Sequence, residues 1–143
     1  MKLNIIIDPS REEEILVCAH RRTPLVEAIE ELVRDNGVEL LGYREREAVP
    51  LELAAVCCFV VERDRVVAKT VAGDYTLKGR LYQLEQRLPD AFVKINQSCI
   101  ANIRQIQKFD TALSGALRVV FRSGYTDYVS RRQLKHVKER LGL

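Results

Sequence analysis

Several kinds of functional site are missing from this sequence. The four cysteines form no C-x-x-C pair and there are only two histidines, so zinc and disulfide frameworks both lack their usual spacing. No apolar run approaches the ~20 residues that a membrane-spanning helix needs. The first apolar stretch is followed by charged residues, unlike a signal peptide. We therefore expect a cytoplasmic protein with no metal, no cofactor and no membrane partner.

The sequence also lacks the marks of an enzyme and of a protein that binds single-stranded RNA. His20 and His136 stand alone, no acidic pair stands out, and there is no G-x-x-x-x-G-K phosphate loop, so we expect no enzymatic activity. Aromatic residues are only 6% of the chain and are scattered along it. Single-stranded RNA is usually bound on clustered aromatic side chains. No motif for a small-molecule ligand is evident.

Charge is distributed unevenly along the chain. From Phe92 to the end there are ten Lys or Arg residues and three Asp or Glu residues, whereas the first 91 residues hold thirteen basic and seventeen acidic ones. A basic half joined to a mildly acidic half indicates that the second half meets an anionic partner. The alternative, that these charges only solvate a surface, fits the charge pattern about equally well.

The first 47 residues predict a small β-β-α-β unit. Its helix begins after Thr23, which can cap the first turn, and ends at Asn36-Gly37. A unit this short cannot be a receiver domain, which needs about five strand–helix repeats, so we expect it to serve packing or dimerisation. Its three predicted strands cover residues 2–8, 14–20 and 38–43.

Residues 48–143 predict a second domain made mostly of strands. One helix carries an apolar stripe formed by Leu77, Leu81, Leu84 and Leu88, and Pro89 ends it. Strands are predicted over residues 53–61, 66–71 and 75–77, from residue 92, and over residues 104–110, 116–122 and 125–129.

Local signals within this domain predict the placement of individual side chains. Ser130 and Gln133 form the pattern of a capping box at the start of a final helix over residues 131–141. Cys57 and Cys58 are neighbours on a predicted strand, so we expect them to be buried thiols that point to opposite faces. The apolar face of a later strand is predicted to carry Leu117, Val119 and Phe121.

The stretch from Phe92 to Asn102 combines a strand with exposed polar side chains. Val93 and Ile95 are expected on one side of the strand, and Lys94 and Asn96 on the other. A short run of small polar residues follows, and Asn102 is suited to bridge backbone groups where the chain turns. Polar side chains at a rigid strand end can present hydrogen bonds to a partner.

This stretch resembles the signature of the LytTR DNA-binding domain. Asn96 and Cys99 stand where that family usually has a histidine and an aromatic residue. Short motifs before and after it, in the same order and spacing as in the family, extend the resemblance over about two thirds of the chain, from about residue 49 to the end. The residues that fit the signature are Phe92, Lys94, Ile95, Ser98, Ile100, Ala101 and Asn102.

The resemblance implies both a fold and a function. The fold is α+β: an elongated, mostly-β LytTR-type domain over residues 48–143, preceded by the small unit of residues 1–47. The function is that of a bacterial transcription regulator without a receiver domain, which places loops, not a recognition helix, into successive major grooves of promoter DNA. We expect double-stranded DNA as the partner and a homodimer, or paired copies, on repeated half-sites.

The resemblance also implies a first group of DNA contacts. Lys94 would neutralise a phosphate. Asn96 takes the position of the family's base-contacting histidine, and either its amide or that of Gln97 could bind an adenine edge. Ser98 could reach a phosphate or cap the turn.

A second group of contacts lies at the start of the final helix. Arg131 and Arg132 are expected to read guanine through O6 and N7, and Arg132 fits the family's arginine best. Lys135 is a phosphate neighbour or plain surface, and a third contact zone is residues 112–115 or residues 122–124, including Arg122. The main alternative is a protein-interaction or dimerisation module whose basic face is incidental.

Overall fold

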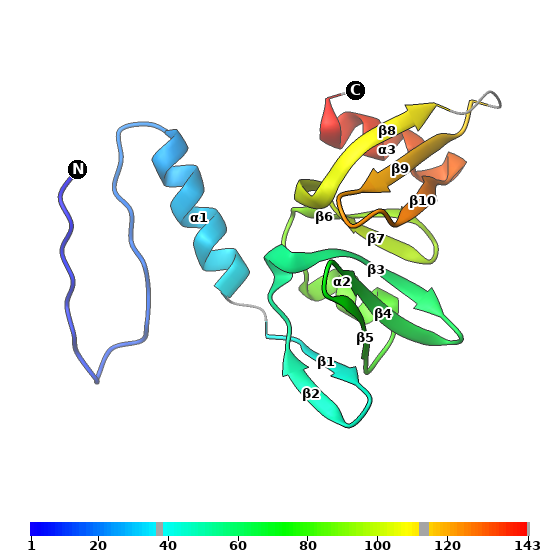
Figure 1. Cartoon of the computed structure of the whole chain (residues 1–143). Helices are drawn as coiled ribbons and strands as arrows, with labels where there is room; N and C mark the ends of the chain where they lie inside the picture. The colour runs from blue at the N-terminus through cyan, green and yellow to red at the C-terminus, as the bar shows by residue number, and fades with distance from the viewer. Residues whose placement is uncertain (37–38, 112–114, 143) are drawn as a thin grey trace. The chain divides into compact units, whose positions relative to one another are not determined.

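The computed structural model describes residues 1–36, 39–111 and 115–142 of the chain and divides into two compact units, residues 1–33 and residues 34–143 (Figure 1). The predicted break after residue 47 falls inside the second unit, within β2 (Glu47–Pro50), which pairs with β1 (Leu41–Arg44). The third strand predicted for the N-terminal unit therefore belongs to the sheet of the larger unit. Its residue 38 lies outside the described residues.

The N-terminal unit contains most of one helix, α1 (Pro24–Asn36), which forms as predicted and continues past residue 33. The hydroxyl oxygen of Thr23 accepts a hydrogen bond from the backbone N–H of Val26 at 3.3 Å. This bond satisfies one of the N–H groups that the first turn of a helix leaves without a partner.

The two strands predicted before α1 are not formed. Residues 2–8 and 14–20 have neither helix nor strand. Within the described segment before Thr23, one hydrogen bond joins two backbone groups of that segment. It runs from the N–H of Arg11 to the carbonyl oxygen of Asp8 at 3.2 Å and closes a turn. A strand is stable only when its backbone groups pair with a neighbouring strand, and the described chain offers these residues none.

The larger unit consists of two antiparallel sheets, three-stranded and seven-stranded, with two helices. The seven-stranded sheet has the order β2-β1-β5-β4-β3-β7-β6 and the three-stranded sheet the order β10-β9-β8. This mostly-β arrangement confirms the predicted α+β fold class. The remaining elements are η1 (Leu53–Ala55), β3 (Val56–Glu62), β4 (Arg65–Thr70), β5 (Gly73–Leu77), α2 (Leu81–Arg87), β6 (Phe92–Asn96), β7 (Cys99–Asn102), η2 (Ile103–Gln105), β8 (Ile106–Thr111), β9 (Leu117–Phe121), β10 (Thr126–Val129) and α3 (Arg131–Leu141).

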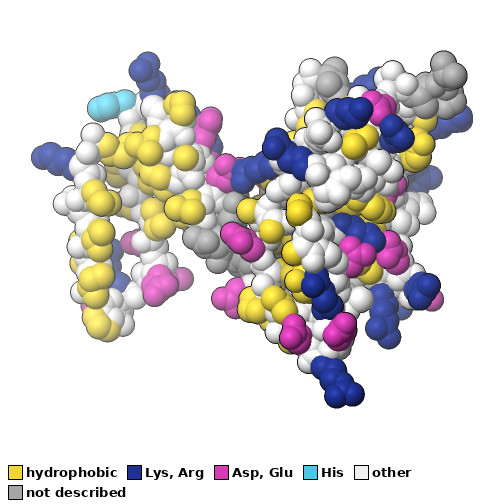
Figure 2. Space-filling view, viewed as in Figure 1, with side chains coloured by type: hydrophobic (Ala, Val, Ile, Leu, Met, Phe, Trp, Pro, Cys, Tyr) yellow, Lys and Arg dark blue, Asp and Glu magenta, His cyan; other side chains and the backbone are white. Residues whose placement is uncertain are grey.

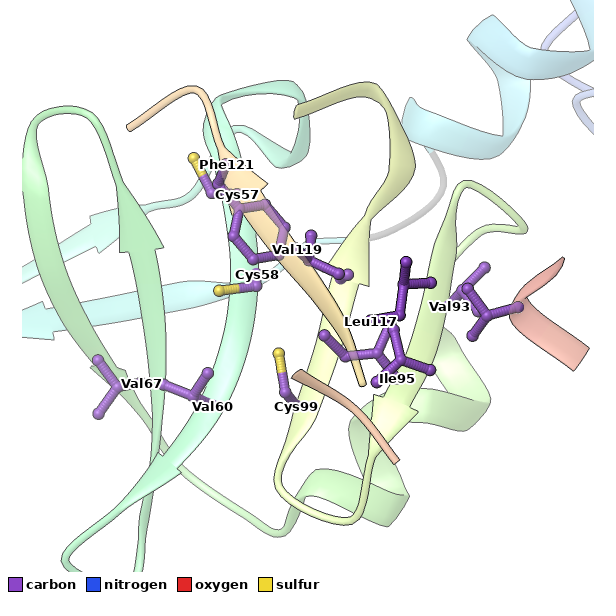
Figure 3. Packing of buried hydrophobic residues seen from close by; sticks show 13 residues of the cluster. Cys57, Cys58, Val60, Val67, Val93, Ile95, Cys99, Leu117, Val119 and Phe121 are labelled. Carbon is purple, nitrogen blue, oxygen red and sulfur yellow. The ribbon is translucent and has the colours of Figure 1, made fainter. Parts of the chain in front are cut away.

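Strands β3 and β7 of the seven-stranded sheet are buried on both faces. On one face α2 packs through Leu81 and Leu84 against Phe59 of β3. On the other face β9 and α3 pack against the sheet, and the three residues predicted to alternate along β9 are all buried there (Figure 3). Apolar burial from both sides is the main stabilising contribution to such a layered fold.

Two neighbouring cysteines share one core, contrary to the alternation expected on a strand. Cys57 and Cys58 are both fully buried in the cluster beneath β9 (Figure 3). The pairing of β3 with β4 shifts register between Val56 and Cys58, and such a bulge rotates a side chain that regular alternation would send to the other face. A hydrogen bond with the Cys58 thiol, together with burial, raises the pKa of Cys99 in the same cluster.

Helix α2 begins later than the leucine stripe predicts. Leu77 belongs to β5 and is buried against the α2 side of the sheet. Gly79 follows with a φ of +96°, a conformation that glycine adopts readily. The Gln83 side chain then accepts from the backbone N–H of Arg80 at 3.0 Å, which fixes the start of the helix.

Helix α3 covers residues 131–141 as predicted, but only half of its capping box is present. The Ser130 hydroxyl oxygen accepts from the N–H of Gln133 at 3.3 Å. The N–H of Ser130 itself donates to the carbonyl oxygen of Ile95 at 2.8 Å. None of the helices in the described ranges is long and apolar enough to cross a membrane.

Candidate nucleic-acid interface

The turn between β6 and β7 lies beside the start of α3. The bond from the Ser130 N–H to the Ile95 carbonyl oxygen joins the two at 2.8 Å. Ile95 directly precedes Asn96, and Ser130 directly precedes Arg131. The structure therefore brings together the two groups of residues that the sequence predicts as DNA contacts.

Asn96 ties this turn to β10 through two hydrogen bonds and closes the turn with a third. Its Nδ2 donates to the Tyr128 carbonyl oxygen at 2.8 Å and to Asp127 Oδ1 at 3.0 Å, and its Oδ1 accepts from the Ser98 N–H at 2.8 Å. A primary amide has two donor hydrogens and two acceptor lone pairs, so one lone pair is left. Bidentate recognition of adenine needs a donor and an acceptor together. Asn96 could provide both only by giving up a bond that holds the turn.

Asp127 is a part of this site that the sequence analysis missed. Its Oδ1 also accepts from the Tyr128 N–H at 2.8 Å, and its Oδ2 lies 3.4 Å from the Tyr125 hydroxyl oxygen. Burial and the negative charge of Asp127 raise the pKa of Tyr125, so the hydroxyl stays protonated and donates. No local signal could have paired positions 96 and 127, because 31 residues separate them.

Lys94 and Asn96 contact different elements, although they were predicted to lie on one side of the strand. The pairing of β6 with β7 shifts register between these two residues. The Nζ atom of Lys94 lies 3.8 Å from Glu85 Oε2 on α2, whereas Asn96 contacts β10. The carboxylate of Glu85 reduces the attraction of Lys94 for a phosphate.

Gln97 and Ser98 form the exposed tip of the β6–β7 turn. Gln97 makes no side-chain hydrogen bond within the part of the chain that the structure describes. The backbone of Ser98 is held on both sides, because its N–H donates to Asn96 and its carbonyl oxygen accepts from the Val61 N–H at 2.9 Å. The turn thus presents a free amide on a fixed backbone.

Arg131, Arg132 and Lys135 are exposed on the first two turns of α3. Lys135 lies four positions after Arg131 and three after Arg132, so the three side chains are neighbours on the helix surface. None of them forms an ion pair with a residue in the described ranges. The partial positive charge of a helix N-terminus adds to theirs.

Arg122 lies at the other end of β10 from Arg131. The hairpin of β9 and β10 is closed there by the bond from the Phe121 N–H to the Tyr125 carbonyl oxygen at 2.9 Å. At about 3.3 Å per residue, β10 and its flanking residues separate this loop from α3 by roughly 15 Å. Of the alternative third zone, residues 112–114 lie outside the described residues. Thr111, the last residue of β8, pairs with Leu117 of β9, and Leu117 pairs in turn with Val129 of β10. Thr111 therefore lies at the end of the three-stranded sheet that is nearer to the start of α3.

An acidic side chain neutralises another arginine of the three-stranded sheet. Arg118 donates to Asp110 Oδ2 at 2.5 Å across the β8–β9 pair, and Lys108 lies 3.7 Å from Oδ1. The hydrogen bond from Arg118 is the main reason that the pKa of Asp110 lies below its ordinary value. Arg118 is therefore a weaker candidate for a phosphate contact than the unpaired cations of α3.

Several known proteins resemble this chain in sequence or in fold. Residues 46–142 match the family model of the LytTr DNA-binding domain. The chain is 34% identical over 146 aligned residues to uncharacterized HTH-type transcriptional regulators of Staphylococcus aureus strains NCTC 8325 and N315, and the alignments cover 100% of this chain and 99% of each relative. A solved LytTr DNA-binding domain from Bacillus cereus aligns with a TM-score of 0.69 at 17% identity, covering 73% of this chain and 97% of that one, which shows the same fold.

The described elements of this chain contain no helix-turn-helix, although the relatives carry that label. Strands β1 to β5 separate α1 from α2, and strands β6 to β10 separate α2 from α3. A helix-turn-helix needs two helices joined by a short turn. The candidate base contacts Gln97, Arg131 and Arg132 lie instead on a turn and at the start of α3.

Proposed function

The chain belongs to the LytTR DNA-binding domain family and is a transcriptional regulator, not an enzyme, and on this premise we propose that it reads specific sequences in duplex DNA. The observation that carries the proposal is that the β6–β7 turn and the start of α3 lie together. They present an unpaired amide at Gln97 and unpaired cations at Arg131 and Arg132. Amide and guanidinium groups are the side chains best suited to the base edges of the major groove.

Arg131 and Arg132 are the proposed guanine readers. A guanidinium group can donate two parallel hydrogen bonds to O6 and N7 of guanine. Both arginines stand on a helix start whose backbone is fixed by the Ser130 bonds, so binding has to order only their side chains and not the backbone. Lys135 extends the same surface and would neutralise a neighbouring phosphate.

Gln97 is the proposed adenine reader of the turn. Its amide is exposed and has both a donor and an acceptor free, unlike the amide of Asn96. We propose that Asn96 mainly positions the turn, and that any base contact it makes uses its one remaining lone pair. Ser98 and Lys94 would contact phosphate, Lys94 after leaving Glu85.

The wider mode of binding follows the family. Loops of the larger unit would reach successive major grooves, and the Arg122 loop, at the opposite end of β10 from α3, would be the outer contact. Two copies would occupy repeated half-sites in a promoter, in the cytoplasm of a bacterium. The rival function is a protein-interaction module with an incidental basic face.

A binding assay across salt concentrations separates these two functions. The probe is a duplex selected from a random-sequence library by the full chain, compared with a scrambled duplex of equal length. We expect log affinity to fall linearly with log salt, with a slope of about −0.9 per phosphate contacted, and the selected duplex to bind more tightly. A flat salt response, or equal affinity for both duplexes, would refute sequence-specific DNA binding.

A further inference from the structure

The N-terminal unit exposes ten large apolar side chains within residues 1–33. Ile5 is 74% exposed and Ile7 is 87% exposed. Single exposed apolar residues are ordinary, but a contiguous set marks a surface that another molecule covers. Figure 2 shows these side chains along the open N-terminal segment and on α1. The set comprises Met1, Leu3, Ile5, Ile6, Ile7, Ile15, Leu16, Leu25, Leu32 and Val33.

The backbone of the same segment is also without partners. Within the described ranges, residues 2–7 make no backbone hydrogen bond. Their side chains are rich in isoleucine, which favours strands. A segment that combines unpaired backbone with strand-forming apolar residues is a template for pairing with another strand.

In the antiparallel direction the charged ends of this segment and its apolar residues at positions 3, 5 and 7 are complementary to themselves, whereas Asn4 meets Ile6. We propose that residues 2–8 pair with the same residues of a second copy of the chain, as an antiparallel two-fold ladder centred on Ile5. In this register Lys2 of each copy faces Asp8 of the other, and Leu3 faces Ile7. Opposite charges and apolar residues directly across an antiparallel pair stabilise it. Parallel pairing would instead place Lys2 against Lys2.

The structure leaves both charged ends of the ladder available. Asp8 uses Oδ1 to accept from the backbone N–H and the hydroxyl of Ser10, at 3.0 and 2.7 Å, and no bond to its Oδ2 is made by the described residues. Lys2 is exposed and forms no ion pair with any of them. Each carboxylate can therefore meet a lysine of the other copy without breaking the Asp8 turn.

The size of the unit fits a dimer interface. A stable interface uses about 20–30 residues from each partner, and the unit spans residues 1–33. Two paired strands alone are marginal in water, so the ladder needs an apolar cover. The exposed stripe of α1, which includes Leu25 and Leu32, belongs to the same unit and can supply it. The partner that satisfies all these features is a second copy.

This inference deepens the homodimer part of the proposed function, and its test needs no DNA. We expect light scattering after gel filtration of the full chain, at about 10 µM, to give twice the 16.4 kDa mass of one copy. A single-copy mass would overturn the inference. Salt-dependent DNA binding could still hold in that case, so the two failures are distinguishable.

Charge reversal tests the register. Lys2→Asp alone and Asp8→Lys alone each place two like-charged pairs in the ladder, and we expect each to weaken dimer formation by about tenfold. The double variant restores opposite charges in both pairs, so its dimer affinity should return close to that of the original chain. A double variant no better than either single variant would exclude this register.

Cross-linking tests the two-fold axis directly. In a Cys18→Ser background, which removes the exposed native thiol, Ile5→Cys places the two introduced thiols across the axis, and mild oxidation should link them. Leu3→Cys is the matched control on the same face, because that position lies about 13 Å from its copy in this register. Equal cross-linking of both variants, or none of Ile5→Cys, would refute the proposed ladder.

Discussion

Asn96→Asp is the substitution that most sharply tests how the interface is built. The change is nearly isosteric and keeps the acceptor oxygen for the Ser98 N–H. It removes both donor hydrogens and places a carboxylate against Asp127 Oδ1 and the Tyr128 carbonyl oxygen, which now lie 3.0 and 2.8 Å from Nδ2. The variant therefore converts two favourable contacts into repulsive ones.

The expected loss of stability can be worked from these contacts. A hydrogen bond to a charged group contributes about 1.5–3 kcal/mol and one to a neutral carbonyl about 1 kcal/mol, so the free energy of unfolding should fall by about 3 kcal/mol at pH 7. Repulsion between the carboxylates adds less than its full value, because the site is partly exposed and the new group can turn to water. With a urea m-value of about 2 kcal/mol/M, the midpoint should fall by roughly 1.5 M.

The loss should also depend on pH. Two carboxylates this close do not both ionise readily, so the introduced group has a folded-state pKa above its unfolded value. Its stability contribution is then most favourable at low pH and is lost as pH rises through the raised pKa. Urea unfolding followed by circular dichroism at pH 5 and pH 7 should show a smaller defect at pH 5.

Gln97→Glu is the matched control, because it makes the same charge change one position later on an exposed, unpaired amide. We expect its unfolding free energy to stay within about 0.5 kcal/mol of the original, while affinity for the selected duplex falls by about 1–3 kcal/mol. An Asn96→Asp protein that unfolds at the original urea midpoint at pH 7 would refute the hydrogen-bond network described for this turn.

Further predictions concern the arginines proposed to contact DNA, the ion pair of Arg118 with Asp110, and the hydrophobic core. Arg132→Ala should cost about 1–3 kcal/mol of binding to the selected duplex in fluorescence anisotropy and relax preference at one base pair, whereas Arg122→Ala should weaken all duplexes alike and reduce the salt slope by about one. The carboxylate of Asp110 should titrate by NMR below its ordinary range, and Arg118→Ala should reduce that shift, with Lys108 keeping the rest. The stability linked to this pair is present at neutral pH and is lost as pH falls through the lowered pKa. Ile95→Val should lower the unfolding free energy by about 0.5–1.5 kcal/mol in urea, since Ile95 is only 1% exposed.

Local patterns predicted much of the larger unit. The alternation of Leu117, Val119 and Phe121 identified the buried face of β9, because side chains on a regular strand alternate with a period of two. Thr23 and Ser130 marked helix starts for a reason that is equally local: their hydroxyl groups cap N–H groups only two or three residues away. The fold class followed from these elements taken together with the family resemblance.

Features that depend on distant partners could not be predicted in this way. The bulge that places Cys57 beside Cys58 in one core is set by the pairing of β3 with β4, and the register shift after Lys94 is set by β7. Asn96 looked like a free amide because its partners on β10 are far away in sequence. Residues 2–8 have a strand pattern, but the described chain provides no strand for them to pair with.

The bonds from Ser130 to Ile95 and from Asn96 to Tyr128 bear on how promoters for this protein can vary. They hold the tip of the β6–β7 turn and the start of α3 at one fixed separation, so in the proposed mode of binding the bases that the two elements contact must lie at a fixed spacing. One inserted base pair moves a base edge by about 3.4 Å and rotates it by about a tenth of a turn. Promoters recognised by this protein should therefore tolerate single substitutions between the two contacted positions but no insertion or deletion there.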